Sequence, residues 1–236
     1  MSVSLLNFYL SLILSIISSW QILYGLPLAA NRLEDLSALR TELDKYGAIV
    51  RLLVDHSDQV RFLEEYENQQ EKPQRWFIFI KINGGQKYVW FIGLNFSNLE
   101  FFYPSRAGVV PGSQEFLSLL EIVLSSQSTI LYGFYGHAGD SYGSTSLSEA
   151  SAFLSGEVES VNVAAKYALE AMDSYYSEAA VSRPFVLSVG STPTAHAASA
   201  ETRKLLSQIL HGKLELHAGG WVAFLVLVVG HDDLCR

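Results

Sequence analysis

Hydroxyl and imidazole side chains gather where apolar runs of this 236-residue sequence end. One apolar run ends at Gly190, which Ser191, Thr192 and Pro193 follow before an alanine-rich segment. This order predicts a strand, a tight turn and a helix, with Thr192 as N-cap and Pro193 in the first turn. Free N–H groups at a helix N-terminus bind anions, phosphate above all. Two interpretations are open, a phosphate site and an ordinary capped turn.

A second cluster spans residues 135–142, with Tyr135, His137, Asp140 and Tyr142 separated by small residues. Small neighbours let a ligand approach closely, so we favour a binding role for His137 over that of a satisfied core histidine. Further candidates share a position at an expected strand end: Asp55, His56, Asn83, Arg106, Thr194 and His217. For Asp55 we expect only a helix cap or turn. No serine lies in a nucleophile-elbow context and no metal-binding spacing such as Cys-x-x-Cys occurs, which disfavours a catalytic triad and a metal cluster.

Composition sets the class of protein. Apolar residues make up 49% of the chain and charged residues 17%, which predicts a folded domain with a sizeable core. The net charge is −8 and no basic block occurs, so nucleic acid is not an expected partner. The one cysteine, Cys235, excludes an intrachain disulfide framework.

The elements that must position these residues alternate along the chain. Apolar runs predict strands at 21–25, 49–54, 76–82, 129–135, 184–189 and 213–217. Helical periodicity predicts helices at 31–46, 57–68, 113–124, 146–176 (with a break near Gly156) and 195–210. Strict alternation implies right-handed crossovers and a parallel sheet. We therefore expect an α/β fold, an incomplete (β/α)8 barrel with about six parallel strands, whose function sits at the carboxyl ends of the strands.

The first residues admit three interpretations, because residues 4–26 carry no charge. They are long enough to span a bilayer, or they form a signal peptide that lacks a basic start. We favour the third interpretation, in which 21–26 is a barrel strand and 1–20 is an apolar leader foreign to the domain.

Several ordered segments resemble the fungal D-serine dehydratases, which share a barrel-type pyridoxal-phosphate fold with D-threonine aldolases and alanine racemases. The matching segments are 81–85, 106–109, 131–142, 188–194 and 215–219, with a looser match over 22–67. The resemblance covers roughly residues 22–219, with 87–105 excluded, and implies that residues 21–219 form a partial alanine racemase-like barrel that binds pyridoxal 5'-phosphate.

The resemblance also implies site residues. The residues expected to hold the cofactor phosphate are Gly190, Ser191 and Thr192. The residues expected to line the cofactor and substrate pocket are Tyr135, His137 and Tyr142, with Arg106 near the cofactor ring. His137 is the catalytic candidate. The implied reaction converts D-serine to pyruvate and ammonia. A homodimer is implied as well, and a small D-hydroxy amino acid is the expected partner.

The departures from this pattern concern the chemistry itself. The family's Schiff-base lysine precedes the first strand, but residues 1–20 contain no lysine. The family's zinc ligands, a His-x-Cys pair in a C-terminal β domain, are also missing, because His231 and Cys235 have the wrong spacing. We therefore expect the chain as written to be inactive, with no metal site. The alternatives are a D-threonine aldolase-like lyase and a non-catalytic barrel remnant that at most binds a phosphate-bearing ligand.

Three segments read as foreign to the family: the leader 1–20, an insert at about 88–105 and the tail 220–236. Joining residue 87 to residue 106 gives a continuous family-like run. Our hypothesis is that these segments are translated introns or come from a mispredicted gene model, in which case the protein is expected to be cytoplasmic. If the leader is genuine, the protein is membrane-associated instead.

Overall fold

One curved sheet forms the centre of the computed structural model, which describes residues 21–25, 33–84, 108–175, 181–194, 196–198, 210–218 and 225–228. Its seven strands lie side by side in chain order. They are β1 (Gln21–Gly25), β2 (Ile49–Val54), β3 (Trp76–Ile82), β4 (Thr129–Gly136), β5 (Val181–Val189), β6 (Lys213–Ala218) and β7 (Leu225–Val228). Strands β1 to β6 are parallel, and β7 runs antiparallel to β6. The six predicted parallel strands are therefore confirmed.

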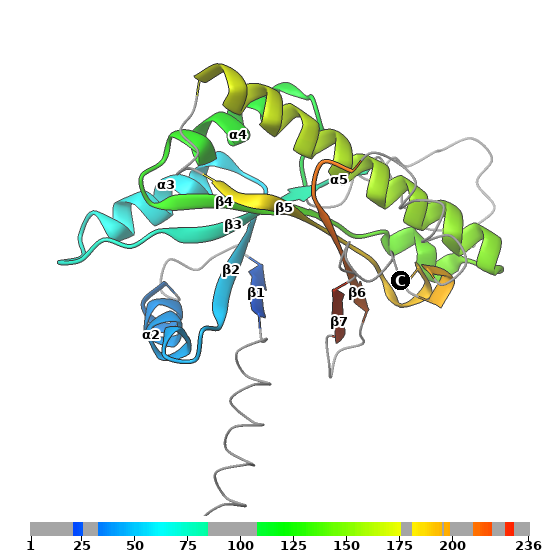
Figure 1. Cartoon of the computed structure of the whole chain (residues 1–236), viewed down its shortest axis with the longest axis horizontal. Coiled ribbons are helices and arrows are strands. Elements are labelled where there is room, and N and C mark those ends of the chain that lie inside the picture. Colours follow the sequence, from blue (N-terminus) through cyan, green and yellow to red (C-terminus); the bar gives the residue numbers. More distant parts are fainter. Residues whose placement is uncertain are drawn as a thin grey trace, which may run out of the picture.

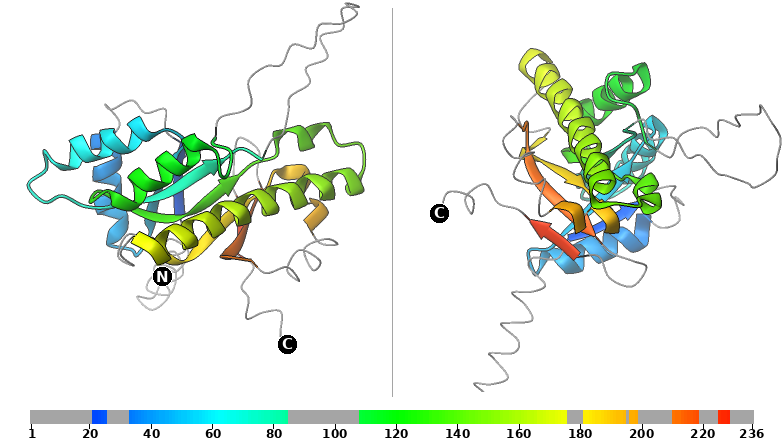
Figure 2. Two further views of the ribbon diagram at one scale, coloured as in Figure 1. Left: turned by 90° about the horizontal axis from the view of Figure 1, so that it is seen from above. Right: turned by 90° about the vertical axis from the view of Figure 1, so that its right-hand side faces the viewer.

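Helices cover the convex face of this sheet, as Figure 1 shows for α3, α4 and α5. The elements are α2 (Leu33–Asp44), α3 (Ser57–Glu67), α4 (Gln114–Ser125), the 3-10 turn η2 (Gly139–Gly143) and α5 (Leu147–Tyr175). A further helix begins at residue 192. Turned views show that the sheet curls, with β1 and β7 at its two edges (Figure 2). Alternating strands and helices around a curled, open sheet make an incomplete barrel.

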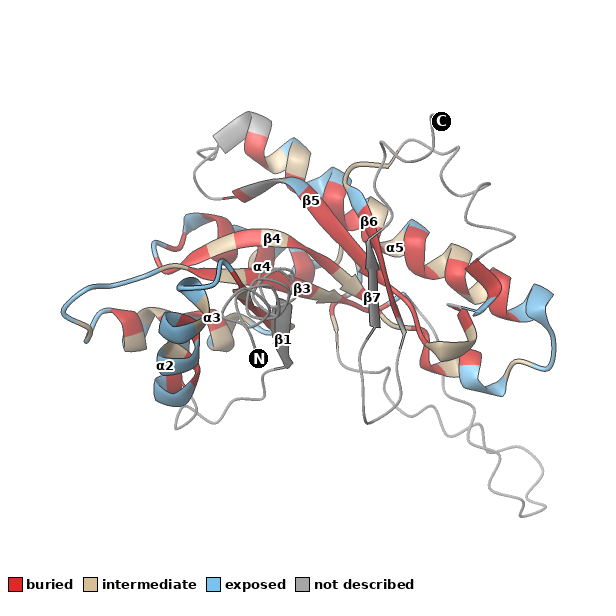
Figure 3. Ribbon diagram, turned by 60° about the horizontal axis from the view of Figure 1, so that its bottom comes forward, coloured by how far each residue is buried: buried red, intermediate tan, exposed pale blue. Residues whose placement is uncertain are grey.

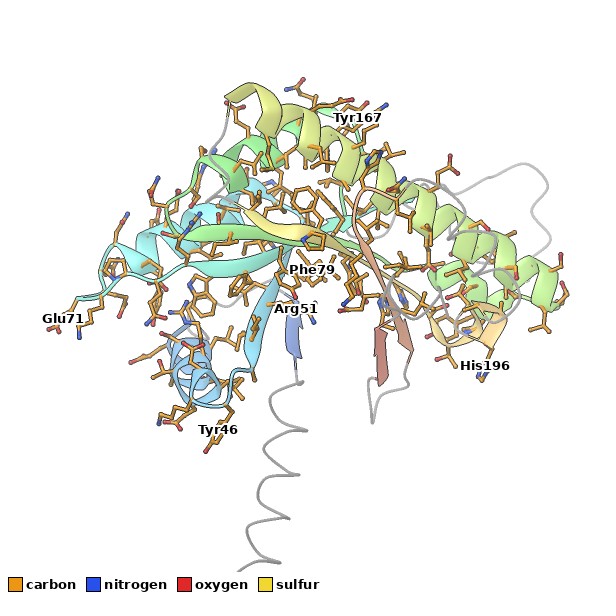
Figure 4. All side chains as sticks on the ribbon, viewed as in Figure 1. Tyr46, Arg51, Glu71, Phe79, Tyr167 and His196 are labelled. Atoms are coloured by element: carbon orange, nitrogen blue, oxygen red, sulfur yellow. The ribbon has the colours of Figure 1, made fainter. Side chains whose placement is uncertain are left out.

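The two faces of the sheet differ in chemistry because side chains alternate along a strand. The convex face and the helices share one apolar core, which includes Leu52, Ile80, Phe134 and Leu187. Figure 3 shows this buried layer along the strands and the inner sides of the helices. The concave face instead carries aromatic, polar and charged side chains. Figure 4 places Arg51 and Phe79 on that face.

Strand β4 approaches β5 so closely that only glycine fits at position 133. A Cβ atom on Gly133 would lie 1.9 Å from the carbonyl oxygen of Val186. The register of β4 shifts at the same place, between Leu131 and Gly133. This bulge sets the direction in which the end of β4 meets β5.

Three details differ from the sequence-based expectations. His56, not Asp55, caps α3, because its Nδ1 accepts from the N–H of Asp58 at 3.2 Å while Gln59 bonds back to the N–H of His56. Helix α5 runs without a break through Gly156, since 29 residues of continuous helix pack on the sheet. Strand β7 lies within the tail 220–236, where no strand was predicted.

After residues 85–107, which lie outside the described part, the chain returns to the end of β3 and forms backbone hydrogen bonds there. The N–H of Asn83 donates to the Val109 carbonyl, and the N–H of Val109 donates to the Lys81 carbonyl, each at 2.9 Å. The chain therefore leaves and returns at one strand end. The predicted leader 1–20 and insert 88–105 also lie outside the described residues, as does most of the helix expected at 195–210. Over the described segments, no helix combines the length and apolarity needed to cross a membrane.

Candidate functional site

One register row crosses the concave face near the carboxyl ends of four neighbouring strands. Lys81 of β3 is opposite Tyr135 of β4, Tyr135 is opposite Ser188 of β5, and Ser188 is opposite Glu215 of β6. Residues that are distant in sequence are thus brought into one row by parallel pairing. This row forms the floor of the candidate site.

Two imidazoles and a second phenol lie near the ring of Tyr135 from this row. The rings of Tyr135 and His217 stack with centroids 4.6 Å apart and planes 5° from parallel. The His137 ring lies 5.9 Å from that of His217, and the exposed Tyr142 ring lies 6.3 Å from that of His137. The structure therefore brings together Tyr135, His137, Tyr142 and His217, all candidates from the sequence.

The turn after β5 joins this aromatic cluster through its glycine. Gly190 has φ of 139°, and a Cβ there would lie 2.1 Å from the His217 carbonyl oxygen. Its own carbonyl is 2.7 Å from Nδ1 of His137. Only glycine meets both the backbone angle and this close approach.

Ser191, rather than Thr192, caps the helix that follows. The Ser191 hydroxyl accepts from the N–H of Thr194 at 3.4 Å, and the Thr194 hydroxyl accepts from the N–H of Ser191 at 2.7 Å. This reciprocal pair is a capping box one residue earlier than predicted, and it places Thr192 in the first turn. The Ser191 hydroxyl also lies 2.5 Å from that of Ser141, so internal contacts occupy it.

A buried carboxyl group supports the turn from beneath. Glu157 of α5 accepts a hydrogen bond from the N–H of Ala138, and its other oxygen has no partner among the described residues. Burial raises the pKa of Glu157 to about 8, and the hydrogen bond from the N–H of Ala138 opposes that rise. At neutral pH the group is therefore mostly the uncharged acid, which does not repel an anion at the turn.

A buried polar chain crosses the barrel interior to His217. Arg51 lies 3.4 Å from Oε2 of Glu215, and Ser188 donates to Oε1 of Glu215 at 3.0 Å. The Ser188 oxygen is 3.2 Å from Nδ1 of His217. Burial lowers the pKa of His217 to about 3, with His137 acting in the same direction and Gly190 opposing. His217 is therefore neutral at physiological pH.

Some residues of the site were predicted from the sequence and others were not. Arg106 lies outside the described residues, so its predicted place near a ligand stays a prediction. The site residues that were not predicted are all buried polar or charged side chains within mainly apolar helices or strands: Arg51, Glu157, Ser188 and Glu215. The periodicity held a signal for Glu157, because it falls on the apolar stripe of Leu154, Val161 and Ala164.

Asp55 and His56 lie elsewhere. They line a hollow of about 240 Å³ together with residues of α3 and α4, away from the turn at 190–194. Over the described residues, no group of three or more His, Cys, Asp or Glu side chains is arranged to hold a metal ion.

No family model matches the chain. It is 38% identical over 202 residues to the D-serine dehydratase of Schizosaccharomyces pombe, a match that covers 85% of this chain and 41% of that protein. It is 32% identical over 176 residues to the D-serine dehydratase of Saccharomyces cerevisiae, covering 71% of this chain and 36% of that one. The chain thus spans less than half the length of these relatives.

Solved structures agree on the fold. The D-threo-3-hydroxyaspartate dehydratase from Delftia sp. HT23 superposes with a TM-score of 0.54 and 27% identity, over 84% of this chain and 41% of that chain. An alanine racemase-like protein from Idiomarina loihiensis gives a TM-score of 0.50 at 23% identity, over 74% of this chain and 37% of that one. The chain is therefore a homologue of the fungal D-serine dehydratases with an alanine racemase-like barrel fold.

Proposed function

We propose that this homologue of the fungal D-serine dehydratases binds pyridoxal 5'-phosphate at residues 190–194, as part of a lyase for D-amino acids that carry a β-hydroxyl group. The observation that carries the proposal is the capped turn at the carboxyl end of β5. Because Ser191 is the cap, Thr192 is in the first helical turn, where a backbone N–H has no partner within the helix. Its N–H and hydroxyl are suited to a phosphate oxygen.

The surrounding residues fit this group. Glu157 is mostly uncharged near neutral pH, so a phosphate dianion meets no buried negative charge at the base of the turn. The unpaired Nε2 of His217 and the stacked ring of Tyr135 supply a polar and a flat aromatic contact nearby. When bound, pyridoxal 5'-phosphate withdraws electrons from the Cα of an amino acid and makes its proton removable.

The chain's own residues would hold ligands and exchange protons. The hydrogen bond between His137 and the Gly190 carbonyl fixes that imidazole beside the turn. Imidazole and phenol groups are common proton carriers, so His137 and Tyr135 are the candidates for this role. The names of the relatives specify D-serine and D-threo-3-hydroxyaspartate, which share a D-configured Cα and a β-hydroxyl. We infer the same substrate class.

We further propose that these 236 residues bind the cofactor without turning substrate over. Residues 1–20 hold no lysine to attach the cofactor before β1. Lys81 is in the row of Tyr135 on β3, a different strand. The His-x-Cys pair expected to hold zinc is absent from the sequence.

The test is a binding titration of the purified chain. Pyridoxal 5'-phosphate is expected to bind, inorganic phosphate to compete, and pyridoxal without phosphate to bind at least about tenfold more weakly, because a hydrogen bond to a charged group contributes roughly 1.5–3 kcal/mol. Thr192→Val should weaken cofactor binding by about tenfold for the same reason. Thr41→Val, on the exposed side of α2, is the matched control and should leave binding unchanged.

Borohydride reduction followed by peptide mass mapping tests the missing lysine. We expect no cofactor attached to a lysine and no pyruvate from D-serine. Specific attachment at Lys81 together with pyruvate formation would refute the inactivity. Equal binding of pyridoxal with and without phosphate would refute the phosphate site.

A further inference from the structure

A chain of hydrogen-bonded polar side chains inside the barrel ends at His217. Arg51, Glu215, Ser188 and His217 come from β2, β5 and β6, and all four side chains are buried. Burying an ion pair costs several kcal/mol per ion unless geometry and further hydrogen bonds offset it. This chain ends at an imidazole whose Nε2 is buried and has no partner among the described residues. Buried polar atoms without a partner are uncommon in folded proteins, and in the described residues they also include Nε of Arg51 and Nε and Nη1 of Arg40. An unpaired imidazole nitrogen differs from these guanidinium atoms because it can accept a hydrogen bond from a ligand.

The direction of the hydrogen bonds follows from the single proton of Ser188. Its hydroxyl is 3.0 Å from a carboxylate oxygen of Glu215 and 3.2 Å from Nδ1 of His217. A carboxylate paired with Arg51 is the stronger acceptor, so the proton of Ser188 goes to Glu215. The Ser188 oxygen is then the acceptor, and the proton between it and the ring belongs to Nδ1 of His217.

We propose that Arg51, Glu215 and Ser188 are positioning residues that hold His217 as a neutral imidazole protonated at Nδ1, with Nε2 presented as an acceptor to an N–H or O–H group of a bound ligand. Stacking against Tyr135 fixes the plane of the ring, and the bond to Ser188 fixes its rotation. The lowered pKa of His217 agrees with a ring that stays neutral. The ligand half of this inference rests on the proposed function, whereas the state of the ring is a property of the ligand-free chain.

A second buried pair serves as the matched control. Arg40 and Glu67 pair at 3.3 Å, and Arg40 lies 3.8 Å over the Trp76 ring. Arg51 likewise lies 4.8 Å from the Tyr132 ring centroid. The two arginine–glutamate pairs are alike in burial and in cation–π contact. Of the two glutamates, only Glu215 shares a serine hydroxyl with an imidazole in the described part of the chain.

The experiment is nitrogen-15 NMR of the histidine rings in the full chain. His217 is assigned by loss of its signals in His217→Gln. In the native sequence the proton is expected on Nδ1, with Nε2 unprotonated down to about pH 5, because the ring pKa is lowered. Ser188→Ala should move the proton to Nε2 in a substantial fraction of molecules, and Ser188→Thr should restore the Nδ1–H form. Glu67→Gln should lower stability without moving the proton.

Each outcome decides a separate point. A native spectrum with the proton on Nε2 overturns the proposal, and this result does not depend on whether Ser188→Ala folds. A Ser188→Ala spectrum equal to the native one also overturns it. Adding pyridoxal 5'-phosphate should shift the Nε2 signal, whereas inorganic phosphate should not. Cofactor binding without that shift overturns the acceptor role. If no cofactor binds, the proposed function is refuted. The protonation state of the His217 ring is then still decided by the spectrum of the ligand-free chain.

Discussion

At the scale of single residues, Gly190 joins the turn to the imidazoles. Its φ is 139°, and a Cβ atom at this position would lie 2.1 Å from the His217 carbonyl oxygen, which leaves no room for a side chain. We expect Gly190→Ala to lower the free energy of unfolding by at least about 2 kcal/mol, since positive φ and a backbone clash add. Chemical denaturation of the two proteins measures this loss.

The control for that substitution is Gly156→Ala in α5. Gly156 has open space around its Cβ position and lies inside a helix. Alanine there should raise the free energy of unfolding by about 0.5–1 kcal/mol. Equal effects of the two substitutions would show that the backbone strain assigned to Gly190 is absent.

The same residue scale shows what a sequence can and cannot predict. The turn at 190–194 was predictable because glycine, hydroxyls and proline follow an apolar run. The cap was displaced by one residue, because Ser191 and Thr192 both carry suitable hydroxyls and only the contact with Thr194 distinguishes them. Glu157 was missed because it is one of several acids in a 29-residue helix, and such acids are expected to face solvent unless their place on the buried stripe is considered.

At the scale of elements, the six parallel strands were predictable because their apolar runs are separated by helical periodicity. Strand β7 was not, because its pairing with β6 is antiparallel and breaks the alternation. The stacking of Tyr135 on His217 likewise depends on strand register, which local patterns do not give.

An element-scale prediction concerns the insert at 88–105. Deleting these residues leaves five to join Gly84 and Gly108, whose strand end is already closed by bonds between Asn83, Val109 and Lys81. A short loop can close that gap at little entropic cost. Shortening the link from 23 residues to five is slightly more than two halvings in loop length, so we expect the shortened chain to melt cooperatively within about 1.5 kcal/mol of the native stability. Aggregation or loss of cooperative melting would show that the segment is integral to the domain.

At the scale of the whole molecule, two buried groups with opposite shifts govern the dependence of stability on pH. The pKa of His217 falls from 6.5 to about 3, so between these values the unfolded chain binds one more proton and stability drops as pH falls. The pKa of Glu157 rises from 4.5 to about 8, so in that window the folded chain binds one more proton and stability drops as pH rises. Between 4.5 and 6.5 the two slopes cancel.

The expected curve therefore has a flat maximum from pH 4.5 to 6.5, with losses of up to about 1.4 kcal/mol per pH unit on either side. Urea denaturation from about pH 3 to about pH 8.5 measures it. Glu157→Gln should remove the loss above pH 6.5, and His217→Gln should remove the loss below 4.5, each leaving the opposite flank in place. A native curve that stays flat from pH 6.5 to 8 would mean that Glu157 is already ionised in the folded chain. The phosphate turn would then carry a negative charge beneath it, and Glu157→Gln should strengthen cofactor binding at neutral pH instead of leaving it unchanged.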